Sequence, residues 1–305
     1  MPKVSIPIAT YNRAGFLEEC LNSCFSQTYK DIEVIVVDDG STDNTPEVAA
    51  KFGDRLKYVR QEHRGNIATY YHARSLCTGK YMTYFGDDDL LFPTFIERGV
   101  EILESDPSLV KFCSDCYMID RKSRRLRKET YLHAYGRSSG RVTLNDLLMY
   151  GCFVHGGMDR RSVFQEIGYY DTSFPHACDY DMYLRMTGAG YGIYYSAEPL
   201  WSYRIHSGMR SHRESEMWKE TVMVLETNLA RFPPSNVVIT SKVERKIGMM
   251  KAWLAVRLFW ERQLSESISY ALAATRNYPP AVVLGALQMA YSNLKGRQSI
   301  YQLGD

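Results

Sequence analysis

The sequence predicts an α/β fold in which a mainly parallel, Rossmann-like sheet is flanked by helices, and three observations support this. Strand-like and helix-like runs alternate through roughly the first hundred of the 305 residues. The strand predicted at 33–37 is rich in β-branched residues, which suits a strand buried on both faces. Polar residues follow directly after three of the predicted strands. Repeated strand–helix units of this length imply parallel strands joined by right-handed crossovers.

The first elements follow one another in a regular order. Val4, Ile6 and Ile8 lie at alternate positions, which predicts a strand that ends at Thr10. Between 16 and 25 the apolar residues recur every three or four positions, as on one face of a helix. The next predicted elements are a strand at 33–37, a helix that starts near Pro46, a strand at 56–59, a helix at 67–76, a strand at 81–85 and a helix from Pro93 onward.

The rest of the chain is less regular. Residues 109–204 mix strand and helix signals. The basic run 121–128 is expected at a solvated hairpin tip. The alternative is that this run binds an anionic polysaccharide or a lipid diphosphate head group. From about 211 the pattern is helical, with one amphipathic stretch around Trp253 and a break at Pro279. Such helices pack on the main domain in most proteins, while an oligomer interface or contact with a membrane surface stays open.

Composition excludes several classes of protein. The 37 Lys and Arg residues nearly balance the 35 Asp and Glu residues, so nothing points to nucleic acid. No apolar run approaches the ~20 residues of a membrane span. The seven cysteines are odd in number and no secretory leader is expected, which favours reduced thiols and a cytoplasmic location. Cys113 and Cys116 form a C-x-x-C pair, but no second pair stands at zinc-finger spacing.

Three polar clusters follow predicted strands: residues 10–13, residues 38–41 and residues 86–89. In open parallel sheets, ligands bind beyond the carboxyl ends of the strands. These clusters are therefore expected to meet at one edge of the sheet, although they are far apart in the sequence.

Asp87, Asp88 and Asp89 place three carboxylates on one short loop. Like charges this close repel one another unless a cation or hydrogen-bond donors neutralise them. Oxygen ligands suit Mg²⁺ or Mn²⁺, either of which commonly binds substrate phosphates as well. The alternative is an acidic turn that caps the helix near Pro93. The position of the three aspartates directly after an apolar strand favours a metal site.

Asp38 and Asp39 end the buried second strand, where a carboxylate can accept hydrogen bonds from a ribose or a base edge. Tyr11 at the same edge can stack on a base. Capping of the following helix is the alternative for these aspartates.

These motifs together resemble the nucleotide-binding half of family 2 glycosyltransferases, which have the GT-A fold. The residues that carry the resemblance are Pro7 and Thr10–Arg13, then 33–43 (EVIVVDDGSTD), then Gly79 and Tyr81 leading to Asp87–Asp89 and Pro93. Further on, 178–185 (CDYDMYLR) resembles the acidic motif with the catalytic base, and 203–206 (YRIH) resembles a later motif. The resemblance implies a catalytic domain over 1–210, with a nucleotide-binding half at 1–108 and an acceptor-binding half at 109–210. A helical region, 211–305, follows it.

The resemblance also implies a role for each matching residue. Thr10, Tyr11, Asn12, Arg13 and Asp39 would surround the base and ribose, and Asp87 would contact ribose or diphosphate. Asp88 and Asp89 would hold the metal, His206 would lie near the metal or pyrophosphate, and Arg204 near the phosphates. Asp179 would be the general base, and His155, Gly156, Gly157 and Met158 would lie near the acceptor.

Three positions depart from the family pattern. Gly86 stands where the metal motif often has its first Asp, and Cys178 stands where the acidic motif often has Glu. Residues 69–71 (TYY) replace a frequent Ala-Arg-Asn, so a donor contact is expected from Arg64 or Arg74 instead.

The resulting expectation is an inverting glycosyltransferase that depends on Mn²⁺ or Mg²⁺. It would move a sugar from a nucleotide sugar, expected to be a UDP-sugar, to a saccharide or lipid-linked acceptor in surface polysaccharide synthesis, in the cytoplasm or at the inner face of the membrane. One alternative is a sugar nucleotidyltransferase, which would show a Gly-rich basic loop after the first strand, unlike residues 10–15. The other is a non-catalytic nucleotide-sugar binding subunit, against which Asp179 and the three aspartates count.

Overall fold

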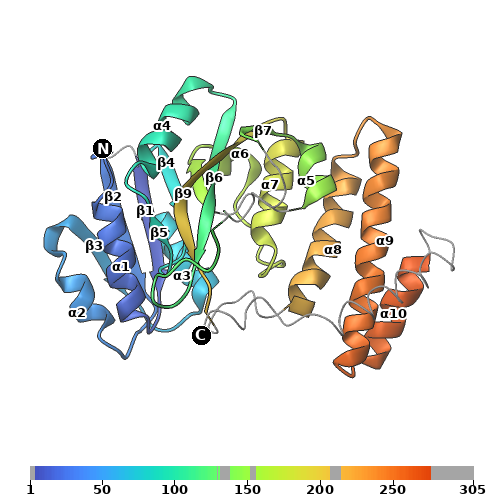
Figure 1. The fold of residues 1–305 in the computed structure, drawn as a ribbon, viewed down its shortest axis with the longest axis horizontal. Coiled ribbons are helices and arrows are strands. Elements are labelled where there is room, and N and C mark those ends of the chain that lie inside the picture. The colour runs from blue at the N-terminus through green and yellow to red at the C-terminus, as the bar shows by residue number, and fades with distance from the viewer. Residues whose placement is uncertain (1–3, 129, 131–137, 152–155, 207–213, 276–305) are drawn as a thin grey trace.

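The computed structural model describes residues 4–128, 130, 138–151, 156–206 and 214–275. Within these residues, nine strands form one sheet in the order β3-β2-β1-β4-β8-β6-β9-β5, and β7 also pairs with β9. Helices cover both faces of the sheet, and a group of longer helices stands beside it (Figure 1).

Strands β1 (Val4–Thr10), β2 (Ile32–Asp38), β3 (Leu56–Arg60) and β4 (Tyr81–Tyr84) pair in parallel, as the sequence predicts. Thr10 lies opposite Asp38 in the register of β1 and β2, so the polar residues after both strands emerge side by side. The connections are helices α1 (Ala14–Phe25), α2 (Thr45–Ala50), α3 (Asn66–Ser75) and α4 (Phe95–Ser105), with a 3₁₀ turn η1 (Gly53–Arg55) before β3.

The second half makes the sheet mixed. Strand β8 (Gly157–Arg160) runs antiparallel to both β4 and β6 (Leu109–Ile119), whereas β9 (Gly192–Arg204) runs parallel to β6. The short strands β5 (Leu90–Leu91) and β7 (Gly140–Val142) pair antiparallel with β9. Helices α5 (Leu144–Tyr150), α6 (Val163–Ile167) and α7 (Cys178–Gly188) belong to this half. The α/β class is therefore confirmed, and antiparallel pairing enters beyond β4.

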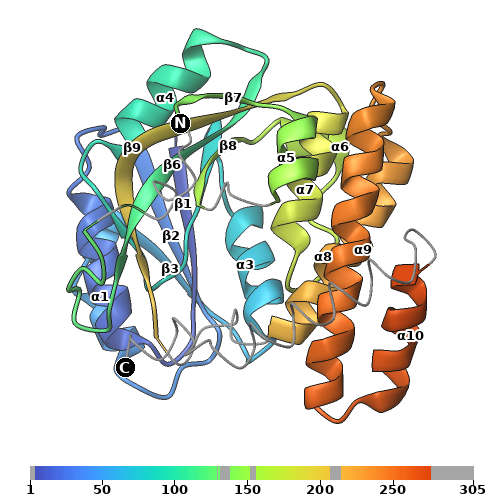
Figure 2. The same cartoon turned by 45° about the vertical axis from the view of Figure 1, so that its right-hand side comes forward.

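Two apolar clusters hold the layers together. Helices α1 and α4 lie on one face of the sheet, and α3, α5 and α7 lie on the other (Figure 2). Leu17, Cys20, Leu21 and Cys24 are buried at helical spacing, and they join the cluster on the α1 face. The cluster on the opposite face includes Leu147, Tyr183 and Val222, and so connects α5, α7 and α8 (Glu214–Arg231). On α5, Thr143 and Asp146 form a capping box that fixes the start of the helix.

The predicted helical region is present as α8, α9 (Val237–Trp260) and α10 (Leu264–Thr275). Trp253 lies within α9, and Pro279 lies outside the described residues. No helix in the described part of the chain has the length and apolarity needed to cross a membrane. Cys113 and Cys116 are buried on β6 and are not joined in a disulfide.

Candidate active site

Asn12 joins the first two polar clusters. Its backbone is in the left-handed region at φ 51°, which Asn tolerates better than most residues. Its backbone N–H donates to Ser41 Oγ at 2.9 Å, and its Oδ1 accepts from the backbone N–H of Thr42 at 2.7 Å. Asn12 thus holds together the loops after β1 and β2, which places the adjacent residues 11 and 13 at one edge of the sheet.

Arg13 joins this edge to the third cluster. Its Nη1 lies 2.9 Å from Asp87 Oδ1 and 2.8 Å from Asp88 Oδ2. The convergence of three clusters, predicted from parallel strands, is therefore confirmed. The result is an Arg guanidinium that bridges two carboxylates of the acidic loop.

The three carboxylates of this loop differ in the direction in which their pKa is shifted. Burial, together with the charge of Asp88, raises the pKa of Asp87 to about 6. Burial and the Asp88 charge also raise the pKa of Asp89 well above its ordinary value. Burial acts to raise the pKa of Asp88 too, but the hydrogen bond from His206 and the charge of Arg13 outweigh it, and its net pKa is lowered. Asp88 is therefore the carboxylate of the loop that ionises most readily.

His206 and Asp89 have different roles at the acidic loop. His206 lies at the end of β9, with Nε2 2.9 Å from Asp88 Oδ2. Asp89 instead accepts hydrogen bonds from two backbone N–H groups, those of Gly86 at 3.1 Å and Arg204 at 3.3 Å. Asp89 thus shapes the loop with both of its oxygens, whereas Asp88 faces His206 and Arg13.

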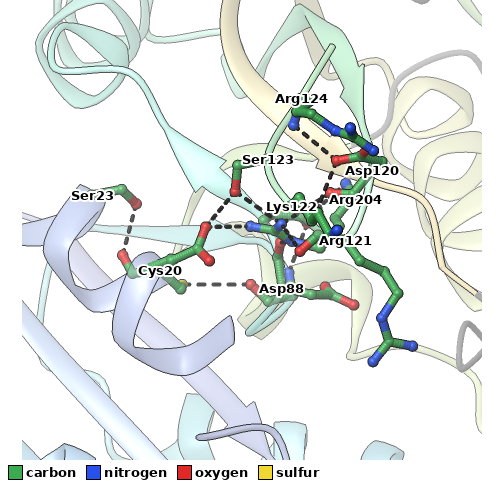
Figure 3. A network of polar contacts seen from close by, with 12 residues as sticks. Cys20, Ser23, Asp88, Asp120, Arg121, Lys122, Ser123, Arg124 and Arg204 are labelled. Carbon is green, nitrogen blue, oxygen red and sulfur yellow. Dashed lines mark hydrogen bonds and ion pairs between the residues drawn. The ribbon is translucent and has the colours of Figure 1, made fainter. Parts of the chain in front are cut away.

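Arg204, which the sequence places near the phosphates, lies beneath the acidic loop, where its guanidinium makes contacts within the protein. Its side chain is fully buried, and its Nε donates to the carbonyl oxygen of Asp88 at 2.8 Å. Nη2 lies 2.9 Å from Glu19 Oε2. Nη1 donates to the carbonyl oxygens of Asp120 and Arg121 and to Ser123 Oγ, so one guanidinium connects the acidic loop, α1 and the turn after β6 (Figure 3).

This turn contains the basic run 121–128. The backbone N–H of Asp120 donates to the carbonyl oxygen of Arg124 at 2.9 Å, and Ile119 bridges Arg125 in antiparallel fashion. The predicted hairpin reversal is confirmed, and Arg204 fixes it to the acidic loop.

We expect Arg204→Lys to lower the free energy of unfolding by about 2–4 kcal/mol, because lysine cannot replace the guanidinium fork and leaves buried acceptors unpaired. Chemical denaturation measures this loss. Lys122→Gln removes an exposed charge from the same turn and should change stability by less than about 0.5 kcal/mol. Equal stability of both variants would contradict the anchoring role of Arg204.

The carboxylate of Asp39 makes hydrogen bonds within the protein. It is almost fully buried and accepts hydrogen bonds from Gln61 Nε2 at 2.7 Å and from the backbone N–H groups of Arg64 and Gly65 at 2.9 and 2.8 Å. Burial acts to raise the pKa of Asp39, but these hydrogen bonds outweigh it and the net pKa is lowered. Asp39 therefore holds the loop 61–65 in place, and its contact with a nucleotide stays a prediction.

The lowered pKa of Asp39 gives a pH-dependent prediction. The unfolded chain binds the proton more readily than the folded chain, so this contribution is present at neutral pH and is lost as pH falls below about 4. Asp39→Asn should cost about 1–3 kcal/mol at pH 7. It should cost less in acid, so thermal melts at several pH values will show the two proteins converging. A constant difference across the pH range would contradict this.

A cavity of about 290 Å³ lies beside the acidic loop. Asp179, on the first turn of α7, lines this cavity together with Arg13 and all three aspartates of the loop. Asp179 Oδ1 accepts from the backbone N–H of Tyr180 at 2.8 Å. The candidate base and the acidic loop are about ninety residues apart in sequence and meet in this one cavity.

Sequence reasoning missed the aromatic wall of the cavity. Its members are Tyr70, Tyr71, Tyr84, Phe85, Tyr170, Trp201 and Tyr203. The sequence signal for this wall is the stretch 69–71 (TYY), which supplies Tyr70 and Tyr71 where the family often has Ala-Arg-Asn. Arg74 lies behind this wall, with Nη1 3.4 Å from the Tyr70 hydroxyl and 3.3 Å from the Tyr170 hydroxyl.

Several predicted site residues lie away from the cavity lining. Thr10 is buried at the end of β1, and Tyr11 is half-exposed and packs against His63 in a tilted arrangement with ring centroids 4.4 Å apart. Arg64 is exposed and contributes its backbone N–H to Asp39. Roles for these residues around a base or ribose stay predictions.

The acceptor set is partly corrected. Gly156 lines the cavity, whereas His155 lies outside the described residues. Met158 is fully buried in the apolar cluster between the sheet and α4, so its expected acceptor contact is wrong. Gly157 lies inside the sheet, where a Cβ would stand 2.4 Å from the carbonyl oxygen of Phe112. It therefore serves close backbone packing instead of an acceptor.

Comparison with known proteins identifies the family. Residues 5–168 match the family model described as Glycosyl transferase family 2. The chain belongs to glycosyltransferase family 2. An uncharacterized glycosyltransferase of Rickettsia prowazekii (strain Madrid E) is 32% identical over 216 residues, which are 69% of this chain and 66% of that protein. Chondroitin synthase of Escherichia coli is 28% identical over 193 residues, which are 62% of this chain and 27% of that protein.

Solved structures show that the chain has the expected GT-A type of fold. Residues 1–349 of S. aureus TarS, in complex with UDP-GlcNAc, give a TM-score of 0.70 at 15% identity over 97% of this chain and 92% of that chain. The mannosyltransferase PcManGT of Pyrobaculum calidifontis, in complex with GDP-Man and Mn²⁺, gives 0.60 at 19% identity over 99% of this chain and 82% of that chain.

The acidic loop has suitable donor atoms for a divalent cation at Asp88. Carboxylate oxygens and an imidazole nitrogen are ligands that Mn²⁺ accepts, and Asp88 and His206 present them 2.9 Å apart. Among the described residues, no three His, Cys, Asp or Glu side chains form a group that could hold a metal ion. Arg13 is the positive group that contacts Asp87 and Asp88 in this structure.

Proposed function

We propose that the protein transfers a sugar from a UDP-sugar to a hydroxyl of a saccharide or lipid-linked saccharide, with inversion and with the help of a divalent cation. The observation that carries this proposal is the shared cavity, in which Asp179 lies with Arg13 and Asp87–Asp89. Transfer needs a group that stabilises the departing diphosphate and a group that takes the acceptor proton, and the cavity supplies both.

The diphosphate side of the cavity is the acidic loop. Asp88 and His206 would hold Mn²⁺ or Mg²⁺, with Asp87 next to the ribose or diphosphate. A bound cation supplies Lewis-acid stabilisation of the charge that develops on the diphosphate. Arg13 contacts both Asp87 and Asp88, and its positive charge offsets the repulsion between these two carboxylates. The Mn²⁺ complex of PcManGT supports this proposal.

Asp179 is the proposed base. Among the described residues that line the cavity, it is the one carboxylate outside the acidic loop. A positioned carboxylate that removes the proton of the acceptor hydroxyl contributes about 10²–10⁴-fold to the rate. With one base and the acidic loop committed to the diphosphate, a single displacement through an oxocarbenium-like state is the simplest path, and it inverts the anomeric carbon.

The substrate class is inferred from the ligands of the structural neighbours. The TarS complexes with UDP-GlcNAc and UDP support a UDP-sugar donor. We place the reaction in the cytoplasm, at the inner face of the membrane for a lipid-linked acceptor. The buried free thiols of the described residues suit a reducing compartment.

A thermal-shift screen tests donor and cation together. UDP, GDP, UDP-GlcNAc and GDP-mannose are each added with and without Mn²⁺. A UDP compound with Mn²⁺ should stabilise the protein most, by about 2.7 kcal/mol when present at 100 times its Kd. Preference for GDP compounds would overturn the donor, and equal shifts without Mn²⁺ would overturn the cation.

A further inference from the structure

His176 and Glu220 form a hydrogen-bonded pair beside the cavity that Asp179 lines. His176 comes three residues before Asp179 and lines the same cavity. Its Nδ1 lies 2.6 Å from Oε1 of Glu220, which belongs to α8. The side chain of Glu220 is only 12% exposed, so solvent weakens this contact little.

Glu220 fixes the position of His176 with both of its oxygens. Its Oε2 accepts from the backbone N–H groups of His176 at 2.5 Å and Ala177 at 3.0 Å, just before α7 begins. Its Oε1 faces the imidazole. The backbone contacts alone satisfy free N–H groups at the start of the helix, so this capping does not require an imidazole at position 176.

The carboxylate also selects the form of the ring. A neutral imidazole carries its proton on the nitrogen that faces the hydrogen-bond acceptor, which here is Nδ1. Nε2 is then left with a lone pair that can accept a hydrogen bond from a hydroxyl.

The surroundings of His176 favour a saccharide. Asp179, Tyr71 and Met217 line the cavity with it, so an acceptor here would meet aromatic and apolar surface beside two polar groups. Cys178, which stands where family members often carry Glu, lines the cavity too. Glu220 from α8 therefore brings a carboxylate to this segment from a distant part of the sequence.

We propose that His176 positions the acceptor saccharide, with Nε2 accepting a hydrogen bond from one acceptor hydroxyl while Asp179 takes the proton of the reacting hydroxyl. The proposal rests on the function proposed above and adds a feature of the substrate: the acceptor carries a second free hydroxyl within reach of the reacting one. Glu220 acts through His176 and is a positioning residue.

Two substitutions at this position separate an acceptor contact from a structural one. His176→Asn keeps an amide N–H near the place of Nδ1, within reach of Glu220, but has no atom at the place of Nε2. His176→Gln reaches the place of Nε2 with an amide group that can accept from a hydroxyl. His72→Asn is the matched control, because His72 Nδ1 also contacts a side-chain oxygen, Gln61 Oε1 at 2.6 Å, but His72 does not line the cavity.

The first measurement needs no substrate. Nitrogen-15 NMR of histidine-labelled protein should show the His176 ring protonated at Nδ1, with Nε2 unprotonated. A proton on Nε2 at neutral pH would overturn the proposal, whatever the activity of the protein.

The second measurement is transfer from UDP-GlcNAc to a panel of methyl glycosides of common hexoses, with donor hydrolysis by water followed in parallel. His176→Asn should raise the acceptor KM roughly five- to thirtyfold, the loss expected for one hydrogen bond, and should leave hydrolysis unchanged. His176→Gln should lie between this variant and the wild type, and His72→Asn should match the wild type.

An unchanged KM in His176→Asn would overturn the acceptor contact, and so would equal losses of hydrolysis and transfer. Failure of the proposed function itself looks different: transfer would then survive in Asp179→Asn, or UDP compounds would fail to bind the wild type. If the panel contains no acceptor, the NMR result still decides between the two ring forms on which the proposal depends.

Discussion

Replacement of Asp179 by Asn is expected to lower the rate of sugar transfer by about 10²–10⁴-fold, the contribution of a positioned general base. The amide has nearly the same shape as the carboxylate but cannot take a proton from the acceptor hydroxyl. Asp179 lines the cavity from α7, whereas Arg13 and the acidic loop form ion pairs with one another. Binding of UDP with Mn²⁺ should therefore stay close to that of the wild type. Initial rates and a thermal shift with UDP measure the two quantities separately.

Asp171→Asn is a suitable control for this experiment. Asp171 is an exposed carboxylate a few residues before α7, hydrogen-bonded to Ser173, and it does not line the cavity. We expect transfer by this variant to be unchanged. Asp179→Glu, which keeps a carboxylate at a shifted position, should retain part of the activity. Transfer by Asp179→Asn within about tenfold of the wild type would mean that another group, with His176 as the nearest alternative, is the base.

The part of the site that could be predicted depends on local pattern and on parallel pairing. Alternation in β1 and the β-branched run in β2 define two adjacent strands, and their register brings Thr10 opposite Asp38. Once the strands are parallel, the residues that follow them must share one edge of the sheet. This is why the meeting of Arg13 with Asp87 and Asp88 could be expected without a structure.

The parts that could not be predicted depend on contacts between distant segments. Arg204 was expected near phosphates because of its motif, yet β9 runs beside β6 and carries its guanidinium beneath the acidic loop, where it binds carbonyl oxygens. Met158 was expected near the acceptor, yet alternation along β8 turns its side chain toward Phe112 and α4. Nothing in the spacing of the sequence pairs His176 with Glu220, because α8 reaches α7 only through tertiary packing.

The acidic loop itself is tested most directly at Asp88. Asp88→Asn removes the carboxylate whose pKa is lowered and which lies 2.9 Å from His206 Nε2 and 2.8 Å from Arg13. An amide is a weak ligand for Mn²⁺ and does not balance the cation's charge. We expect the added thermal stabilisation by UDP plus Mn²⁺, relative to UDP alone, to disappear, and transfer to fall by about 10²–10³-fold, as when a group that stabilises developing charge is removed.

Asp120→Asn provides the matched control for this loss. Asp120 is also a buried carboxylate near Arg204, but it accepts from the backbone N–H groups of Lys122 and Arg124 within the basic turn and does not line the cavity. Its replacement should lower stability but leave the added thermal stabilisation by Mn²⁺ intact, because the Asp120 carboxylate makes its hydrogen bonds within the basic turn. If Asp88→Asn keeps the full Mn²⁺ increment, the cation is held elsewhere. If UDP stabilises the wild type equally with and without Mn²⁺, Arg13 itself supplies the positive charge that the departing diphosphate needs. Arg13→Gln should then abolish transfer.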